Sequence, residues 1–426
     1  MTALNTPPLK TMELLRFSTA GSVDDGKSTL IGRLLYDAKS IFEDTLDAIA
    51  RTTMKKGQEG LNLALLTDGL QAEREQGITI DVAYRYFATP RRKFIIADTP
   101  GHEQYTRNMV TGASTSDLAI ILVDARKGPL IQSRRHAYLS SLLGIRHLVI
   151  AVNKMDTANY SDKRFKEIQH DFEPFLKRLG IPHLYFIPMS ALHGDMVVER
   201  GENLDWYKGP TLLDLLETVP VSLSTAHLPA RLPVQLVCRP QTPELPDFRG
   251  YMGRIESGTL KTGEAVTILP SGQRSRIRNL YLGEKELSEA IAPQSIQVTL
   301  EDEIDISRGD MIVSSQDSLP KTVRKFEAKV CWLSETPLDL RRKYLLKHAN
   351  RTVKAIVESL DYLVDINSLE QKPALTVEVN DIAHIHLKVL QPVMAEPYHE
   401  NRKLGAFILI DESSNMTVAG GMIEKA

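Results

Sequence analysis

The first half of the chain alternates short apolar runs with segments of helical periodicity. Between about residues 17 and 219, the runs 94–97, 118–123 and 148–152 are almost continuously apolar. Strands of this kind are buried on both faces, as in a parallel sheet covered by helices on both sides. Each run ends in a polar segment, and open α/β sheets bind ligands beyond the carboxyl ends of their strands. The pattern predicts a mostly parallel, doubly wound α/β domain with a ligand site at one sheet edge.

The second half has the sequence pattern of a β-barrel or a β-sandwich. Pro220, Pro229 and Pro233 interrupt a stretch that is too broken for a helix and is interpreted as a linker. Beyond it, short strands are separated by Gly, Pro, Asn and Asp. A second seam lies near residues 318–325. With 426 residues to divide, we expect an α/β domain at 1–222 and β-barrels at 229–318 and 322–426.

One strand of the last domain carries two histidines. Apolar residues occupy every second position of residues 383–389, which predicts one buried face with His384 and His386 pointing outward. Such a pair could ligate a metal, but no third ligand lies nearby in the sequence, so a solvated face is favoured. The basic clusters at 91–93 and 341–343 are interpreted as a hairpin tip and a solvated surface.

Composition excludes several function classes. The net charge is -2, so no bulk field draws the chain toward nucleic acid or an anionic membrane, and an anionic ligand needs a local site. Cys238 and Cys331 are the only cysteines, which favours two buried thiols in a reducing cytosol. No segment is predicted to be a signal peptide or a membrane span. We expect a soluble cytoplasmic protein without a nucleic-acid or membrane partner.

A phosphate-binding motif opens the α/β domain. The segment follows a short strand, precedes a helical pattern and fits G-x-x-x-x-G-K-[ST]. Its glycines let several backbone N–H groups point at a β-phosphate, with the positive end of the helix behind them. Lys27 is expected to bridge the β- and γ-phosphates, and Ser28 to bind Mg²⁺ through its hydroxyl. The candidate residues are Gly21, Ser22, Val23, Asp24, Asp25, Gly26, Lys27, Ser28 and Thr29.

Each of three further segments follows a strand, and their order along the chain is that of the motifs of a guanine-nucleotide site. Any one of them alone could be a simple turn. Asp98 is expected near Mg²⁺, and the Gly101 N–H near the γ-phosphate. The Asp156 carboxylate can accept the N1 and N2 donors of guanine, whereas adenine has no such pair on that edge. The third segment offers a backbone N–H to guanine O6. The segments are Asp98, Thr99, Pro100 and Gly101; Asn153, Lys154, Met155 and Asp156; and Ser190, Ala191 and Leu192.

Besides Lys27, two residues are candidates for the hydrolytic step. Thr79, in the segment 76–80, is expected to supply a second Mg²⁺ hydroxyl from a switch that orders around the γ-phosphate. His102 directly follows Gly101 and is expected to orient the attacking water. The alternative for His102 is a helix N-terminal histidine without a catalytic role. Val23 and Ile78 are expected to shield the water until a partner docks.

These motifs resemble the translational GTPases, in which a nucleotide domain precedes two β-barrels. Within that superfamily the chain resembles the large GTPase subunits of bacterial ATP sulfurylases (sulfate adenylyltransferase subunit 1) from about residue 15 to residue 423. Asp25 stands where the tRNA-carrying elongation factor has a histidine. The segments 105–114, 127–136, 401–411 and 417–423 are similar to the sulfurylase branch.

The resemblance implies GTP and Mg²⁺ as ligands and a heteromer with a small subunit. That subunit would bind ATP and sulfate and form adenosine 5′-phosphosulfate and pyrophosphate, driven by GTP hydrolysis on this chain. Some relatives carry a further adenylylsulfate kinase domain after the second barrel. Because this sequence ends at Ala426, we expect no kinase activity. The alternatives are a translation factor that delivers charged tRNA and a switch without linked chemistry.

Overall fold

The computed structural model describes residues 12–39, 63, 81–102, 105–221, 225–240 and 248–426. The chain divides into two compact units, Met1–Ser222 and Leu223–Ala426. Within the described part, no helix is long and apolar enough to cross a bilayer.

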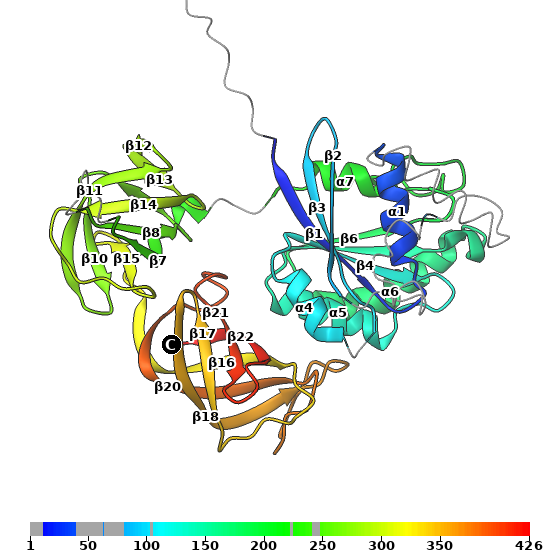
Figure 1. The fold of residues 1–426 in the computed structure, drawn as a ribbon. Coiled ribbons are helices and arrows are strands. Elements are labelled where there is room, and N and C mark those ends of the chain that lie inside the picture. Colours follow the sequence, from blue (N-terminus) through cyan, green and yellow to red (C-terminus); the bar gives the residue numbers. More distant parts are fainter. Residues whose placement is uncertain (1–11, 40–62, 64–80, 103–104, 222–224, 241–247) are drawn as a thin grey trace, which may run out of the picture. The chain divides into compact units, whose positions relative to one another are not determined.

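The first unit is built on a six-stranded sheet in the order β2-β3-β1-β4-β5-β6 (Figure 1). The strands are β1 (Leu14–Gly21), β2 (Ala83–Ala88), β3 (Lys93–Asp98), β4 (Leu118–Asp124), β5 (His147–Asn153) and β6 (His183–Pro188). The helices are α1 (Lys27–Asp37), α4 (Thr106–Ala113), α5 (Ile131–Leu142), α6 (Asp162–Arg178) and α7 (Leu212–Thr218), with the 3-10 helix η3 (Met155–Ala158) after β5.

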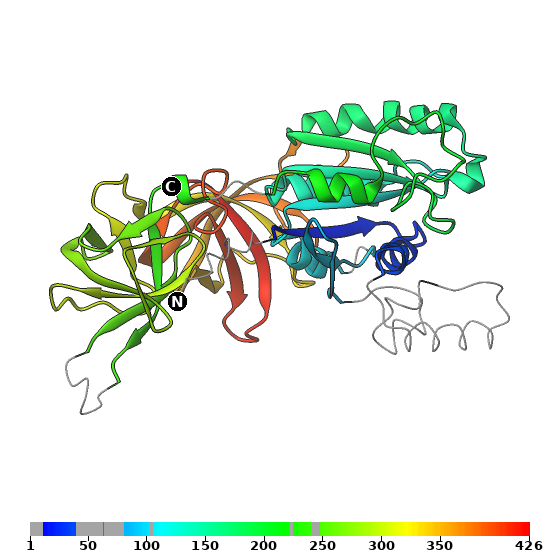
Figure 2. The same ribbon diagram turned by 90° about the horizontal axis from the view of Figure 1, so that it is seen from above.

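Five of these strands are parallel, and only β2 runs antiparallel, paired with β3. Every residue of β4 and β5 is buried, because helices cover both faces of the sheet. Figure 2 shows α1 on one side and α6 on the other. The predicted doubly wound α/β fold is confirmed, and each predicted apolar run lies within one strand.

The second unit consists of β-strands with one short 3-10 helix, η4 (Thr225–His227). Its first strands are β7 (Arg231–Cys238), β8 (Gly250–Arg254), β9 (Thr259–Lys261), β10 (Ala265–Leu269), β11 (Gln273–Leu282), β12 (Lys285–Leu287), β13 (Glu289–Ile291), β14 (Ser295–Leu300) and β15 (Met311–Ser314). The others are β16 (Lys321–Trp332), β17 (Lys343–His348), β18 (Arg351–Val364), β19 (Gln371–Lys372), β20 (Ile382–Ala395), β21 (Ala406–Asp411) and β22 (Thr417–Lys425).

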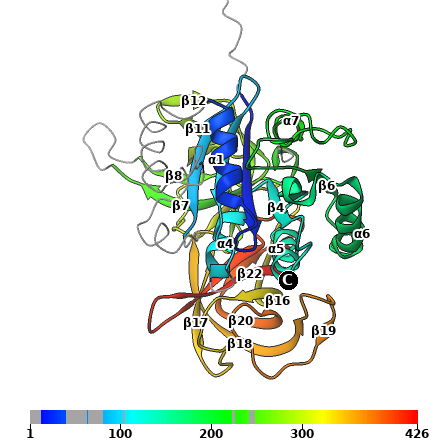
Figure 3. The same cartoon turned by 90° about the vertical axis from the view of Figure 1, so that its right-hand side faces the viewer.

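These strands close into two barrels. The first runs β10-β15-β7-β8-β14-β11 and closes through the β10–β11 pairing, with β12 added beside β11. The second runs β17-β21-β22-β16-β20-β18 and closes through β17–β18, with β19 beside β18 (Figure 3). Each barrel has its own apolar core. Closure removes exposed sheet edges, and it confirms the expectation of two all-β barrels.

The two barrels share a buried joint. Leu269, Met311 and Val313 of the first pack against Met394 and Leu404 of the second. Beside this cluster, the Arg231 guanidinium, with a side chain only 2% exposed, lies 2.7 Å from Glu396 Oε1. Arg231 also donates to the Ser318 carbonyl at 2.6 Å. The guanidinium is therefore desolvated and paired at the junction.

Some predictions about single positions are wrong. Pro233 lies inside β7 rather than in a linker, and it pairs with Met311 just before a bulge at Val234/Leu236. Residues 91–93 lie at the tip of the β2–β3 hairpin as predicted, but the Arg92 side chain is buried rather than solvated and donates to the carbonyls of Leu216 and Val219 near the end of α7.

Two further side chains differ from expectation. His384 is buried at 7% exposure and does not point into solvent, because Asp361 of the adjacent strand covers it. Cys331 is buried as expected, but Cys238 at the end of β7 is partly exposed, and neither forms a disulfide within the described part of the chain.

Removing the charge of Glu396 should destabilise the second unit. The substitution Glu396→Gln leaves the Arg231 guanidinium buried without its counter-charge, so we expect a loss of about 3 kcal/mol in the free energy of unfolding. Urea unfolding of the full chain would measure it. Glu412→Gln is the control, because Glu412 pairs with Lys354 where both side chains are exposed. Equal stability of the two variants would contradict the importance of this pair.

Candidate nucleotide-binding site

The carboxyl ends of the parallel strands bring the predicted motifs together at one edge of the sheet. β1, β3, β5 and β6 lead respectively into the loops that begin at Gly21, Thr99, Lys154 and Met189. Hydrogen bonds join these loops to one another, as described below. Thr79 and the rest of the segment 76–80, including Ile78, lie outside the described residues. The sequence-predicted phosphate and base segments therefore form one continuous rim.

Two glycines of this rim have no room for a side chain. Gly26 has φ +94°, and a Cβ there would lie 2.5 Å from Asn153 Nδ2. A Cβ on Gly101 would lie 2.3 Å from the Gly21 carbonyl oxygen and 2.4 Å from Lys27 Nζ. The backbone of Gly101 therefore lies directly against the β1–α1 loop. Glycine at both positions is needed for this close approach.

The Lys27 ammonium is held inside the β1–α1 loop. Lys27 Nζ donates to the carbonyl oxygens of Gly21 at 2.9 Å and Ser22 at 3.1 Å. Burial lowers the pKa of Lys27, and the nearby Asp98, Asp25 and Asp24 carboxylates oppose that effect. A buried cation with only carbonyl partners is favourably placed to receive an anionic phosphate group.

Asp98 and Ser28 offer oxygen atoms of the kind that Mg²⁺ prefers. Asp98 is buried at the end of β3, and its Oδ1 accepts from Thr19 Oγ1 at 3.2 Å. Thr99 fixes the following turn by donating from Oγ1 to the Thr19 carbonyl at 2.7 Å. Ser28 is partly exposed in the first turn of α1. The donor set of carboxylate and hydroxyl fits a magnesium ion.

Asp25 is a buried carboxyl group within the loop, at 2% exposure. Its Oδ2 accepts from the Ser22 N–H at 2.8 Å, whereas its Oδ1 and the Ser22 hydroxyl find no hydrogen-bond partner among the described residues. Burial raises the pKa of Asp25 from 3.8 to about 6, although the Ser22 hydrogen bond opposes the shift. Orphaned polar atoms in a buried loop indicate a place where a ligand completes the hydrogen bonding.

Asn153 connects the phosphate side of the rim to the base side. Its buried amide donates from Nδ2 to the Asp25 carbonyl at 2.8 Å. Its Oδ1 accepts from the Ala191 N–H at 2.9 Å. One side chain thus fixes the spacing between the loop after β1 and the loop after β6.

The base side is formed by η3 and the loop after β6. Asp156 is partly exposed on η3, and its Oδ1 accepts from Ser190 Oγ at 2.6 Å. The Ala191 N–H already donates to Asn153. The Leu192 N–H has no acceptor in the described part of the chain, so it is the amide of this loop that remains available to a ligand oxygen. The Asp156 carboxylate thus offers hydrogen-bond acceptors to a ligand, and the Leu192 N–H offers a donor.

Lys154, the first residue after β5, contacts both the loop after β1 and the end of β4. It adopts a left-handed conformation with φ 62°, and its ammonium donates to the Asp24 carbonyl and lies 3.1 Å from Asp124 Oδ2. Burial alone would raise the pKa of Asp124, but hydrogen bonds from Arg126 and Lys154 hold it below its ordinary value. A permanently charged Asp124 therefore anchors Lys154 across the rim.

The remaining predicted site residues differ in how exposed they are to solvent. His102 is exposed immediately after Gly101. Thr99, Pro100 and Met155 are buried, and Val23 and Thr29 are partly exposed. The positions of these residues do not by themselves test a role in catalysis.

Comparison with known proteins places this arrangement in a family. The model of the elongation factor Tu GTP binding domain matches residues 12–223, and a GTP-eEF1A C-terminal domain-like model matches residues 325–424. A sulfate adenylyltransferase subunit 1 from Cellvibrio japonicus is 51% identical over 96% of this chain and 86% of that protein. The chain belongs to the sulfate adenylyltransferase subunit 1 family.

Other members differ in length. The bifunctional enzyme CysN/CysC of Rhodopirellula baltica is 53% identical over 96% of this chain, and the chain spans 63% of that relative. A solved structure of Sup35 complexed with GMPPNP is more distant, with 23% identity and a TM-score of 0.44 over 97% of this chain and 94% of that chain. It adds nothing to the assignment.

Sequence reasoning missed two residues that support the nucleotide site of this family member. Asp124 ends β4 beside Asn153 in the sheet register, so its place directly after an apolar run was a usable signal. Arg33 on α1 donates to the carbonyls of Ala191 at 3.3 Å and Leu192 at 2.6 Å. No local pattern indicates the role of Arg33, because its partners lie about 160 residues further along the chain.

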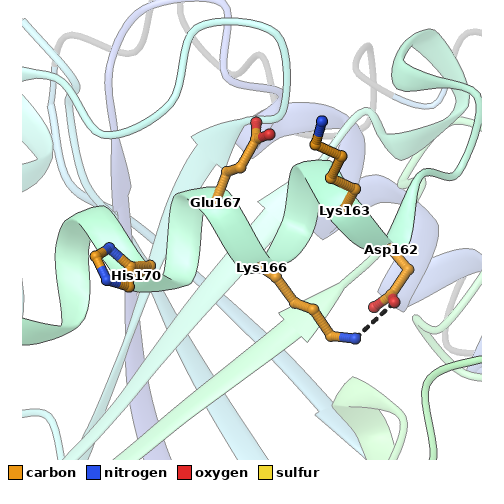
Figure 4. A pocket seen from close by; sticks show the side chains of 5 residues that line it. All are labelled: Asp162, Lys163, Lys166, Glu167 and His170. Carbon is orange, nitrogen blue, oxygen red and sulfur yellow. Dashed lines mark hydrogen bonds and ion pairs between the residues drawn. The ribbon is translucent and has the colours of Figure 1, made fainter.

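A separate surface hollow lies along α6 (Figure 4). All of its lining side chains come from that one helix, and Lys166 pairs with Asp162 across it at 2.6 Å. None of them belongs to a loop at the strand ends. The lining residues are Asp162, Lys163, Lys166, Glu167 and His170. This hollow is therefore not part of the nucleotide site.

Replacing Asp25 by Asn should change how stability depends on pH. Because burial raises the folded-state pKa from 3.8 to about 6, the folded protein keeps a proton that the unfolded chain releases in this range. The neutral carboxyl therefore stabilises the nucleotide-free fold fully below about pH 4, and this contribution falls as the pH rises to about 6. Wild type should lose about 2 to 3 kcal/mol over this range relative to Asp25→Asn.

Urea unfolding at several pH values would measure this difference. Asp24→Asn is the matched control, since Asp24 is the exposed neighbour and has a left-handed φ of 68° that Asn tolerates. Parallel pH profiles for wild type and Asp25→Asn would show that Asp25 is not kept neutral by burial.

Proposed function

We propose that this chain is the GTP-hydrolysing subunit of a heteromeric, cytoplasmic sulfate adenylyltransferase. In this role its GTPase cycle drives the formation of adenosine 5′-phosphosulfate and pyrophosphate from ATP and sulfate. The observation that carries the proposal is the rim in which Asn153 joins the phosphate loop to the base loop, in a chain 51% identical to a relative named for this activity. The proposed domain boundaries are 1–222, 229–318 and 322–426.

The phosphates are held by the loop after β1. Backbone N–H groups within the segment Gly21 to Thr29 donate to the phosphate oxygens. On binding, the Lys27 ammonium leaves the carbonyls of Gly21 and Ser22 and contacts the β- and γ-phosphates. Asp25 contributes no repulsion while it holds its proton. Burial raises the pKa of Asp25 to about 6, so its carboxyl group is mainly neutral only below about that pH.

Mg²⁺ is the cation that the donor set fits, with Ser28, Asp98 and Thr79 as its protein ligands. When bound, it neutralises charge that develops on the phosphate oxygens. Thr99, Pro100 and Gly101 place the Gly101 N–H at the γ-phosphate. His102, exposed beside Gly101, orients the water that attacks the γ-phosphorus, with Val23 and Ile78 limiting its access.

The base is selected by Asp156 together with the loop Ser190, Ala191 and Leu192. Ser190 Oγ holds Asp156 Oδ1 at 2.6 Å and fixes the carboxylate plane, so that Asp156 accepts from guanine N1 and N2. A backbone N–H of the loop donates to guanine O6. Lys154 and Met155 hold η3 in place, since Lys154 is tied to Asp24 and Asp124 and Met155 is buried.

Coupling to sulfate activation requires a partner, a small subunit that binds ATP and sulfate. The phosphate–sulfate anhydride is high in energy, so its formation needs a linked downhill step. GTP and GDP states of this chain would favour different conformations of the partner, and the partner's substrates must then change GTP affinity by the same factor. A translation factor is the alternative, and recovery of charged tRNA with the purified chain would favour it.

The substitution Asp156→Asn should transfer base preference from guanine to xanthine nucleotides. Xanthine carries an oxygen at C2 in place of the amino group, so an amide donor matches it and a carboxylate does not. We expect GDP affinity to fall by about 10²-fold or more and xanthosine diphosphate affinity to rise. Calorimetry with both nucleotides would measure this, with Asp162→Asn on α6 as control. Unchanged GDP affinity would remove Asp156 from base recognition.

Reconstitution with a small sulfurylase subunit tests the function itself. Pyrophosphate should accumulate only when ATP, sulfate, GTP and both subunits are present.

The substitution His102→Ala should slow single-turnover GTP hydrolysis by about 10²-fold or more at unchanged GTP affinity, whereas His170→Ala on α6 should not. Pyrophosphate formation at an equal rate without GTP would contradict the coupling, and an unchanged hydrolysis rate would exclude His102.

A further inference from the structure

Three side chains of the second barrel converge on one point. Asp361 Oδ2 lies 2.8 Å from His384 Nδ1 and 2.8 Å from His386 Nε2. The three ligand atoms all lie within 4.8 Å of one another. The cluster belongs to the unit Leu223–Ala426, whereas the nucleotide loops belong to Met1–Ser222.

Strand irregularity creates this convergence. His384 and His386 are two residues apart on β20 and therefore share a face of the sheet. On β18, Leu360 pairs with Ile385 and Tyr362 with His384, so Asp361 is an extra residue at a bulge. A bulge redirects the side chain of the inserted residue. It brings a third potential ligand to the two histidines from a strand more than 20 residues earlier.

The second ring nitrogen of His384, Nε2, also lies close to a carboxylate. His384 Nε2 lies 3.3 Å from Glu424 Oε2 on β22, and Glu424 Oε1 is 2.5 Å from Lys329 Nζ. Tyr362 stacks on the His384 ring at 4.9 Å with an interplanar angle of 7°. A carboxylate behind a ligating histidine fixes the ring orientation and its tautomer, as is usual at metal centres.

Both ring nitrogens of His384 therefore face carboxylate oxygens, Nδ1 at 2.8 Å from Asp361 and Nε2 at 3.3 Å from Glu424. The negative charge of these carboxylates favours a cation bound at His384 Nδ1. Two imidazole nitrogens with one carboxylate oxygen are the donor set of zinc-type ions, and Mg²⁺ prefers oxygen alone.

We propose that Asp361, His384 and His386 bind a divalent transition-metal ion of the zinc type. Asp361 is exposed and the His386 side chain is 39% exposed, so solvent reaches the site and water completes the coordination. Lys325 and Lys388 are both paired with Glu358, which limits their repulsion of the ion. The ion links β18 to β20 and, through Glu424, to β22.

Metal titration of the full chain without a histidine tag tests the proposal. Chelator-treated protein is saturated with GDP and Mg²⁺, to occupy the nucleotide site, and titrated with Zn²⁺ by calorimetry and with Co²⁺ by visible absorption. We expect one Zn²⁺ per chain and a Co²⁺ spectrum of low-symmetry nitrogen and oxygen coordination. His386→Gln and Asp361→Asn should each weaken binding by about tenfold or more.

His399→Ala is the matched control, since His399 is 75% exposed in the same unit and pairs with Glu400; this variant should bind Zn²⁺ as wild type does. Circular dichroism and GDP affinity show whether each variant is folded, and the two partly exposed ligands allow independent substitutions. No saturable Zn²⁺ binding by wild type, or equal binding by His386→Gln and wild type, would overturn the proposal. Either result would leave the cluster as a hydrogen-bonded group of histidines and a carboxylate without a metal site.

Discussion

The side-chain amide of Asn153 is the interaction on which the nucleotide site depends. It donates to the Asp25 carbonyl and accepts from the Ala191 N–H, so this one side chain directly contacts both the predicted phosphate loop and the predicted base loop. Both bonds are buried, where an unpaired polar group costs about 1 to 3 kcal/mol. The spacing between phosphate and base groups is therefore set by the protein before a nucleotide arrives.

Charged groups near the Asn153 amide are arranged so that the loop after β1 can bind an anion. Lys27 is buried with carbonyl partners, burial raises the pKa of Asp25 to about 6, and Asp124 holds Lys154 against the Asp24 carbonyl. Arg33 adds a second connection, from α1 to the base loop. Rigid supports of this kind lower the ordering cost of binding, as the proposed nucleotide-controlled switch requires.

Sequence reasoning predicted the parts that depend on periodicity and local motifs. Continuous apolar runs correctly indicated β3, β4 and β5, and the motifs located the loops that meet at the sheet edge. It could not predict contacts between distant segments. Arg33 contacts a loop about 160 residues away, Arg92 is buried by the end of α7, and Asp361 reaches His384 only because of a bulge on another strand. Alternation alone suggested a solvated His384.

The central claim is that this rim binds a guanine nucleotide and rejects adenine. Calorimetric titration of the full chain with GDP and with ADP, each with Mg²⁺, tests it most directly. The geometry of Asp156, Ser190 and the following amides predicts saturable binding of one GDP per chain, tighter than ADP by about 10³-fold or more. Equal affinity for the two nucleotides, or binding of neither, would contradict it.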